Sequence, residues 1–286
     1  MKLTDIINSD RLSLSFEVFP PKTSDTFESV KTATEKIARL EPSYMSVTYG
    51  AGGGNSQYAL QIAENLKAKG ITPLAHLTCV SSTKAEINAR LNEFKANGIE
   101  NILALRGDRP KDETVLKTDY SYASELIKDI KAFGGFCIGG ACYPESHPES
   151  ESSFKDIENL KLKVEAGCEF LTTQMFFDNN IYYNFLYRLN NAGINVPVVA
   201  GIMPVTNPSS IKRICRISGS LLPQRFIRIV DRFGDNPEAM LDAGIAYATE
   251  QIVDLFANGV KAVHVYSMNK PEVAAKIKEN IKSIIK

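Results

Sequence analysis

Eight short apolar runs alternate with longer segments in which apolar residues recur at helical spacing. The runs occupy residues 12–19, 44–48, 72–80, 102–105, 136–143, 170–174, 196–202 and 260–266. Strands that alternate with helices in this way pair in parallel, because each helix returns the chain to the same edge of the sheet. Eight such units favour a closed (β/α)8 barrel, the TIM barrel, over an open doubly wound sheet, although periodicity alone leaves both open. The predicted fold class is therefore α/β.

A chain of 286 residues has the length of one such barrel. No linker, low-complexity segment or block of like charge divides it, so we expect residues 1–286 to form a single catalytic barrel domain. Two helical patterns, at 209–217 and 238–258, follow the seventh run. Residues 223–235 lie between these two patterns without a predicted element.

The charges of the chain cancel, with 33 basic and 33 acidic residues, so no net field draws it to nucleic acid. No apolar stretch reaches the ~20 residues that span a bilayer, and the first residues do not read as a signal peptide. Five cysteines form no C-x-x-C pair and lie mostly in apolar stretches, which favours reduced, buried thiols. We therefore expect a cytoplasmic protein that binds neither nucleic acid nor membrane.

The run at 102–105 stops abruptly at Arg106, Gly107 and Asp108. Ligands of α/β folds sit at the carboxyl ends of strands, where this loop falls. Arg106 offers a fork of donors, Gly107 lets a ligand approach the backbone, and Asp108 supplies a charge, although a surface Arg-Asp turn explains the loop alone equally well. Other runs end in equally polar or reactive residues: Glu17, Thr48, Tyr49, His76, Thr78, Tyr143, His147, Gln174, Met203 and His264. In a barrel these ends converge on one mouth, which favours a ligand site there.

Glu17 lies near the end of the first run, among Phe16, Val18 and Phe19 and before two prolines. Apolar surroundings raise the pKa of a carboxyl group and suit it to act as a general acid. A carboxylate paired with a neighbouring Lys or Arg is the alternative that the sequence leaves open.

Several other kinds of site are not supported by the sequence. The three histidines have no second ligand at helical spacing, so no metal is expected. No G-x-S-x-G motif is present, and the glycines at 50–54 lack the G-x-G-x-x-G spacing, so that loop is either a flexible connection or a ligand contact. A barrel aldolase or isomerase that uses Glu17 and Asp108 remains an alternative, although no run ends in a lysine for a Schiff base.

Six motifs and their order resemble those of the methylenetetrahydrofolate reductases. They lie at residues 15–22, 47–53, 76–79, 105–108, 143–148 and 173–178, and the likeness continues through 201–204 to the C-terminus. The length is similar to that of the short bacterial form. The resemblance implies an FAD-containing (β/α)8 barrel without a Rossmann fold. It also implies ping-pong transfer of hydride from NADH or NADPH through the flavin to 5,10-methylenetetrahydrofolate, which gives 5-methyltetrahydrofolate.

The resemblance also implies roles for individual residues. Glu17 matches the acid that protonates the bridging nitrogen of the folate, and Asp108 matches the carboxylate beside the flavin ring and the pterin. Gln174 matches the amide that recognises the pterin, and Thr48 matches a nicotinamide contact at the cofactor site. The positions that match FAD contacts are Tyr49, Ala51, His76, Arg106, Gly107, Tyr122, Ala123, Tyr143, His147, Asp156, Asn159 and Lys163. Among them Arg106, His147 and Lys163 can donate to the pyrophosphate or ribose.

Two positions depart from the family pattern. Pro208 stands where some members have a phenylalanine that stacks on the substrate, and Lys270 stands where the family often has arginine, so a point charge replaces a fork toward the substrate. The electron donor stays open between NADH, NADPH and a partner protein. The alternative function is accordingly an FAD-binding subunit of a larger complex, and the sequence equally leaves a homo-oligomer open.

Overall fold

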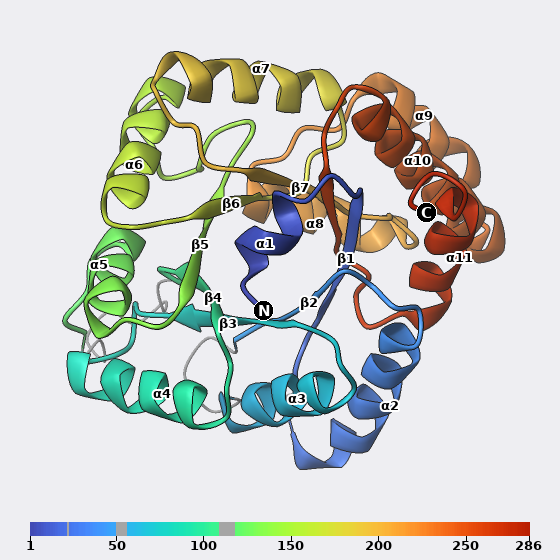
Figure 1. Ribbon diagram of the computed structural model, residues 1–286. Coiled ribbons are helices and arrows are strands. Elements are labelled where there is room, and N and C mark those ends of the chain that lie inside the picture. The colour runs from blue at the N-terminus through green and yellow to red at the C-terminus, as the bar shows by residue number, and fades with distance from the viewer. Residues whose placement is uncertain (22, 50–55, 109–117) are drawn as a thin grey trace.

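Eight parallel strands pair in sequence order, and the last pairs with the first to close a barrel (Figure 1). The computed structural model describes residues 1–21, 23–49, 56–108 and 118–286. The strands are β1 (Ser13–Val18), β2 (Met45–Val47), β3 (Pro73–Thr78), β4 (Asn101–Leu105), β5 (Cys137–Cys142), β6 (Phe170–Thr173), β7 (Val198–Ile202) and β8 (Ala262–Val265). The β1–β8 register, which pairs Ser13 with Ala262 and Phe16 with Val265, confirms the predicted single-domain (β/α)8 barrel.

One helix precedes β1, one follows β8, and the others connect successive strands around the barrel (Figure 1). They are α1 (Leu3–Ile7), α2 (Phe27–Ala38), α3 (Ser56–Ala68), α4 (Lys84–Ala96), α5 (Ala123–Phe133), α6 (Ser153–Glu165), α7 (Asn179–Asn191), α8 (Pro208–Ser218), α9 (Gln224–Phe233), α10 (Pro237–Ala257) and α11 (Pro271–Ile281), with a 3-10 turn, η1 (Ser24–Thr26), before α2. Helices α8 and α9 both lie between β7 and α10, so this connection is longer than a single crossover helix.

Helix α9 fills the stretch 223–235, for which the sequence analysis predicted no element. Its apolar residues do have helical spacing, since Phe226 is buried and Ile229 and Val230 pack beside it. Arginines separate these residues, and Pro223 precedes the helix, so the segment resembles a polar connection. The carbonyl of Pro223 accepts the first hydrogen bonds of the helix, from the backbone amides of Phe226 and Ile227.

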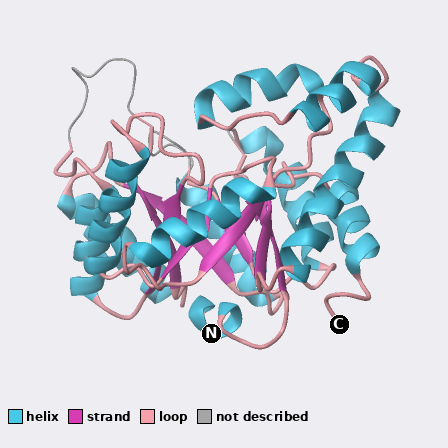
Figure 2. Ribbon diagram, turned by 90° about the horizontal axis from the view of Figure 1, so that it is seen from above, coloured by secondary structure: helices cyan, strands magenta, loops and turns pink. Residues whose placement is uncertain are grey.

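The barrel interior is apolar at the end where the strands begin. Side chains that include Tyr44, Leu74, Leu103, Phe170 and Val199 fill it, and Leu3 and Ile7 of α1 pack against them. Figure 2 shows the short helix at the N-terminus at one end of the strands, with other helices extending past their opposite end. Helix α1 therefore closes this end of the barrel, and the carboxyl ends of the strands form the mouth.

Asn101 and Gly139 shape the packing under that closure. The side-chain oxygen of Asn101 accepts a hydrogen bond from the backbone amide of Leu3, at 2.7 Å, and so ties α1 to β4. Gly139 leaves room for Phe170, because a Cβ at this glycine would lie 2.3 Å from the phenyl ring. The fully buried Phe170 contributes about 2–3 kcal/mol of hydrophobic stabilisation.

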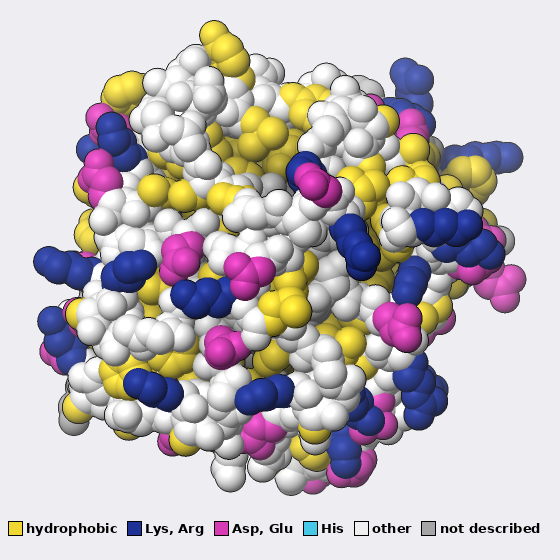
Figure 3. All heavy atoms as spheres, viewed as in Figure 1, with side chains coloured by type: hydrophobic (Ala, Val, Ile, Leu, Met, Phe, Trp, Pro, Cys, Tyr) yellow, Lys and Arg dark blue, Asp and Glu magenta, His cyan; other side chains and the backbone are white. Residues whose placement is uncertain are grey.

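Acidic and basic side chains are interspersed on the face around α1, with hydrophobic side chains between them (Figure 3). This face has no extended region of one charge. In the described part of the chain, no helix is both long enough and apolar enough to cross a membrane.

Candidate active site

Glu17 on β1 and His76 on β3 face each other inside the mouth of the barrel. His76 Nε2 lies 3.8 Å from Glu17 Oε2, and both side chains are buried. Burial raises the pKa of Glu17 to about 8 and lowers the pKa of His76 to about 3. Near pH 7 the carboxyl group therefore holds its proton and the imidazole is neutral, so the two do not form an ion pair.

The carboxyl group of Glu17 has no charged partner in the described part of the chain. No Lys or Arg nitrogen there lies within 4.0 Å of it, and no hydrogen bond to its side-chain oxygens is found among the described residues. The apolar surroundings expected from the sequence are present, whereas the alternative of a Lys or Arg partner finds no support in these residues. His76 Nε2 is likewise buried without a hydrogen-bond partner. The mouth thus contains an unpaired acid beside an unsatisfied ring nitrogen.

His264 lies deeper in the barrel than its place near the end of the eighth run suggested. Its Nδ1 is 2.7 Å from Ser15 Oγ and its Nε2 is 2.9 Å from Ser46 Oγ, so both ring nitrogens have partners. The ring stacks on Tyr44 with centroids 5.5 Å apart, and burial lowers the pKa of His264 to about 3. The expectation of His264 among the mouth residues was therefore wrong, and it serves the interior packing.

Tyr266, two residues further on, occupies the mouth in its place. Its hydroxyl donates to the Thr173 carbonyl at 2.5 Å. Burial raises the pKa of Tyr266 well above its usual value, and a charge on Glu17 would raise it further. The ring fits because position 201 is glycine: a Cβ there would lie 2.6 Å from the Tyr266 hydroxyl. Alternation along the strand puts residues 264 and 266 on the same inner face, and this signal could have identified Tyr266 from the sequence.

Arg106 is held in a fixed position at the end of β4. Its two terminal nitrogens donate to the carboxylate of Glu149, at 2.5 and 2.7 Å, and Nε donates to the Gly107 carbonyl at 3.1 Å. Glu149 was not predicted, because no local pattern links it to a residue 43 positions earlier. Gly107 has φ +88°, and a Cβ there would lie 3.1 Å from Thr78 and Val80, so the tight turn requires glycine.

The loops after β4, β5 and β6 bring a second group of predicted residues together. Tyr143 packs edge-to-face on His147 with ring centroids 4.6 Å apart. Desolvation raises the pKa of Tyr143, a hydrogen bond with Gln174 opposes the rise, and the negative charge of Asp108 adds to it. Asp108 itself is exposed. One polar wall of the mouth is thus formed by Arg106, Asp108, Tyr143, His147 and Gln174.

Helix α6 supports this wall from behind. Asp156 is buried and accepts a hydrogen bond from the backbone amide of His147, at 3.2 Å, and burial raises its pKa. Lys163 Nζ donates to the Ala141 carbonyl at 2.8 Å, and desolvation lowers its pKa. Asn159 is exposed. The structure therefore places Asp156 in a supporting position and commits Lys163 to a backbone carbonyl.

The remaining predicted residues lie around the rim. Thr48 and Tyr49 are half-buried after β2, and the Thr48 amide donates to the Val18 carbonyl at 3.0 Å. At the start of α5, Tyr122 is 61% exposed and Ala123 is buried. Lys270 Nζ lies 2.8 Å from Thr206 Oγ1, which links the start of α11 to the loop before α8. Ala51 and the glycine cluster lie outside the described residues.

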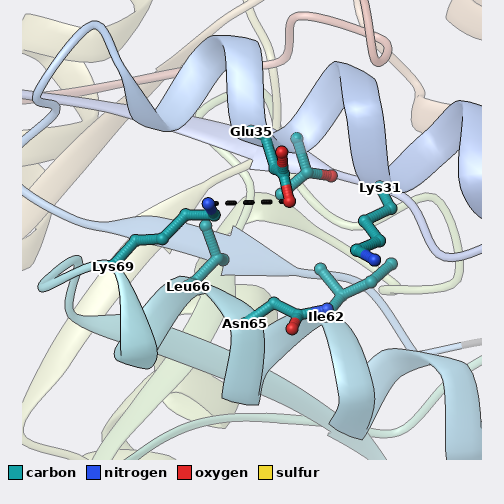
Figure 4. Close-up of a pocket in the computed structure, with 7 residues that line it drawn as sticks. Lys31, Glu35, Ile62, Asn65, Leu66 and Lys69 are labelled. Carbon is teal, nitrogen blue, oxygen red and sulfur yellow. Dashed lines mark ion pairs between the residues drawn. The ribbon is translucent and has the colours of Figure 1, made fainter.

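Three surface hollows in the described part of the chain lie away from the predicted site residues. A crevice between α2 and α3 has a volume of about 10 Å3, room for one water molecule, and is bordered by the Lys69–Glu35 ion pair at 3.6 Å (Figure 4). A hollow of about 460 Å3 flanks α7 near the start of β8, and one of about 360 Å3 lies among α7, α9 and α10. Across the described ranges, no group of three or more His, Cys, Asp or Glu side chains is placed to hold a metal ion.

Comparison with known proteins gives one consistent family. The sequence model of the family described as methylenetetrahydrofolate reductase matches residues 2–282. The 5,10-methylenetetrahydrofolate reductases of Pectobacterium carotovorum subsp. carotovorum and Escherichia coli K12 are each 34% identical over 265 residues, covering 92% of this chain and 88% of the relative. Methylenetetrahydrofolate reductase (NADH) 1 of Zea mays is 33% identical over 98% of this chain, which spans 50% of that longer protein.

Solved structures share the barrel architecture. An uncharacterized protein from Clostridium thermocellum that binds two copies of 5-methyl-5,6,7,8-tetrahydrofolic acid superposes with a TM-score of 0.70 at 17% identity, covering 99% of this chain and 100% of that chain. Dihydropteroate synthase from Xanthomonas albilineans, in complex with 7,8-dihydropteroate, gives a TM-score of 0.52 at 15% identity over 96% of this chain and 94% of that one. At these identities the likeness shows the fold alone.

Proposed function

The chain belongs to the methylenetetrahydrofolate reductase family, and we propose that it reduces 5,10-methylenetetrahydrofolate to 5-methyltetrahydrofolate with bound FAD and a reduced nicotinamide. The observation that carries this proposal is Glu17, a buried carboxyl group at the mouth whose pKa is raised to about 8. The family supports reduction of the folate, while the flavin, the donor and the residue roles are our proposal.

The polar groups of the mouth fit FAD. His76 Nε2 is a buried ring nitrogen without a partner, which a hydrogen-bonding group of the flavin would satisfy. Arg106 presents two parallel donors that suit an anionic oxygen pair such as the pyrophosphate, and His147 lies on the same wall. The other positions proposed for the cofactor site would complete it: Thr48, Tyr49, Ala51, Gly107, Asp108, Tyr122, Ala123, Tyr143, Asp156, Asn159 and Lys163. When bound, FAD would carry the hydride between the nicotinamide and the folate.

Glu17 would supply the proton that opens the folate ring. A carboxyl group with a pKa of about 8 is protonated at neutral pH and can donate to the bridging nitrogen of the five-membered ring. The C–N bond then breaks, its electron pair stays on that nitrogen, and the remaining nitrogen and the one-carbon group form a cationic iminium. Hydride addition to that carbon gives the methyl group. The neutral His76 allows this transfer, because an imidazolium at 3.8 Å would hold Glu17 as carboxylate.

Asp108 and Gln174 would act on the pterin side of the site. The exposed carboxylate of Asp108 places a negative charge on the wall where the cationic iminium develops. The Gln174 side-chain oxygen accepts from the Met175 amide, at 3.0 Å, and its amide group also bonds Tyr143, so the side chain is held on the wall where it would meet the pterin. Lys270, held by Thr206, would attract a carboxylate of the folate.

A nicotinamide donor agrees with the name of the Zea mays relative, which specifies NADH. The test is to purify the protein and record its visible absorption, then mix it anaerobically with NADH and with NADPH in parallel. Bleaching of the flavin bands, followed by reoxidation on addition of methylenetetrahydrofolate, is expected. A protein without flavin absorption would contradict the cofactor proposal. A flavin that stays oxidised with both nucleotides would contradict the nicotinamide and favour electron delivery by a partner protein.

A further inference from the structure

The turn after β8 has an unusual backbone at two successive residues. Met268 and Asn269 both have φ +55°, in the left-handed region that side chains other than glycine rarely adopt. Such a conformation is strained and persists where surrounding contacts enforce it. The Lys270 amide closes this turn by donating to the Ser267 carbonyl, at 3.0 Å.

The side chain of Asn269 spans the gap between this turn and the end of β1. Its oxygen accepts from the Phe19 amide at 2.8 Å, and its nitrogen donates to the Phe19 carbonyl at 3.0 Å. One amide thus satisfies both backbone groups of the second residue after Glu17. The buried Ser267 hydroxyl adds a third bond, to the Glu17 carbonyl at 3.2 Å. Beyond the β1–β8 ladder, these three bonds join the backbone on either side of Val18 to the turn after β8, while β2 and the Thr48 amide hold Val18 from its other side.

We infer that Asn269 is a positioning residue for Glu17: its amide fastens the end of β1 to the turn after β8 and holds the Glu17 carboxyl against His76 and Tyr266, away from water. No backbone group of the turn replaces this contact, because a parallel ladder ends where the strands diverge. The left-handed conformation at residues 268 and 269 directs the amide onto Phe19. The backbone strain of the turn is therefore linked to the fixed position of the carboxyl group.

The groups that face Glu17 show why its pKa depends on keeping water away from the end of β1. His76 approaches from β3 and Tyr266 follows β8, while the β2 partner in the register is the uncharged Ser46. Both titratable neighbours are neutral near pH 7, since burial lowers the pKa of His76 to about 3 and raises that of Tyr266 well above its usual value. Desolvation is accordingly the cause of the raised pKa of Glu17. A looser β1 end would admit water and let the carboxyl group ionise at lower pH.

The test replaces the amide without adding backbone strain. Asn269→Gly removes both bonds to Phe19, and glycine adopts φ +55° without strain. Met268→Gly relieves the same kind of strain but keeps the Asn269 amide. The carboxyl carbon of Glu17 is followed by NMR in protein labelled with 13C-glutamate, with its signal assigned by its loss in Glu17→Gln. We expect the titration midpoint of Glu17 to fall by about one pH unit or more in Asn269→Gly. The Met268→Gly protein should titrate like the wild type.

Unchanged titration in folded Asn269→Gly would overturn the inference, as would an equal fall in Met268→Gly. Asn269→Ala removes the same bonds and gives the second measurement should the glycine variant not fold. The role in folate reduction rests on the proposed function, but the NMR titration does not. If the wild type fails to reduce methylenetetrahydrofolate while Asn269→Gly lowers the midpoint, the proposed function falls and the positioning role stands.

Discussion

The carboxylate of Glu149 occupies both terminal nitrogens of Arg106, at 2.5 and 2.7 Å. This is the arrangement that a guanidinium makes with a phosphate, so Glu149 holds the donors that we assign to the cofactor. The Glu149 side chain is 55% exposed, whereas that of Arg106 is 17% exposed. The more exposed partner is the one that can move aside at low cost.

Glu149→Gln should therefore bind FAD about 1.4- to fivefold more tightly, because exposed ion pairs are worth roughly 0.2–1 kcal/mol. Flavin fluorescence quenching during titration of the apoprotein measures this affinity. Glu158→Gln, which removes the surface partner of Lys155, is the control and should bind like the wild type. Weaker binding in Glu149→Gln would mean that Glu149 orients Arg106 rather than competing for it.

Glu17→Gln should lose folate reduction by about 100-fold or more, since general acids contribute typically 10²–10⁴-fold. The amide keeps the size of the side chain but cannot supply the proton. Reduction of the flavin by nicotinamide needs no such proton donor and should stay within about twofold of the wild type. Anaerobic stopped-flow absorbance measures the two half-reactions separately. Near wild-type rates in both would remove Glu17 from its role, and the exposed Glu28→Gln on α2 serves as the control.

Three buried groups with large pKa shifts, His76, His264 and Glu17, contribute to the pH dependence of stability. Folding lowers the pKa values of His76 and His264 from 6.5 to about 3, so their two protons bind only to the unfolded chain and stability rises as pH rises through this range. Folding raises the pKa of Glu17 from 4.5 to about 8, so its proton binds only to the folded chain between these values, and stability falls as pH rises. Up to pH 6.5 the two histidine protons outweigh the single Glu17 proton, and the stability rises with pH. Above pH 6.5 only Glu17 titrates, and the stability falls.

From these groups the free energy of unfolding should be greatest near pH 6.5 and decline toward pH 8. Urea unfolding at a series of pH values measures it. The decline above pH 6.5 should disappear in Glu17→Gln, because the amide does not titrate. The same decline in that variant would assign it to other groups.

Lys270→Met should raise the KM for methylenetetrahydrofolate about tenfold and leave kcat nearly unchanged. Lys270 is held by Thr206 beside the start of α8, and we propose that its charge attracts a folate carboxylate without taking part in the reaction. Steady-state kinetics over a range of folate concentrations separates the two constants. The exposed Lys276→Met on α11 is the matched control. A fall in kcat at constant KM would place Lys270 nearer the chemistry.

The barrel could be predicted from the sequence because its signals are local. Each strand is a short apolar run and most crossover helices end near a glycine, so all eight strands were predicted to within a few residues of their ends. Helix α9 was missed since its arginines obscure the helical spacing of Phe226, Ile229 and Val230. Helix α1, with five residues, is too short to show a period.

The site was predictable only as far as strand ends can be read. Glu17 was expected to be desolvated from its apolar neighbours, and the structure places it so. His264 was assigned to the mouth because the sequence does not show where the last ladder bond forms, and that point decides whether residue 264 or residue 266 reaches the opening. The pairing of Arg106 with Glu149 depends on the path of the β5–α6 loop, which no local pattern records.

The position of helix α1 has a consequence for how ligands bind and dissociate. Leu3 and Ile7 close the barrel at the end where the strands begin, so in the described part of the chain Glu17 is approached from the mouth. The proposed nicotinamide and folate would then both have to enter and leave through the mouth. Each could bind only after the other had dissociated. The alternating binding of nicotinamide and folate would then follow from a five-residue helix at the opposite end of the barrel.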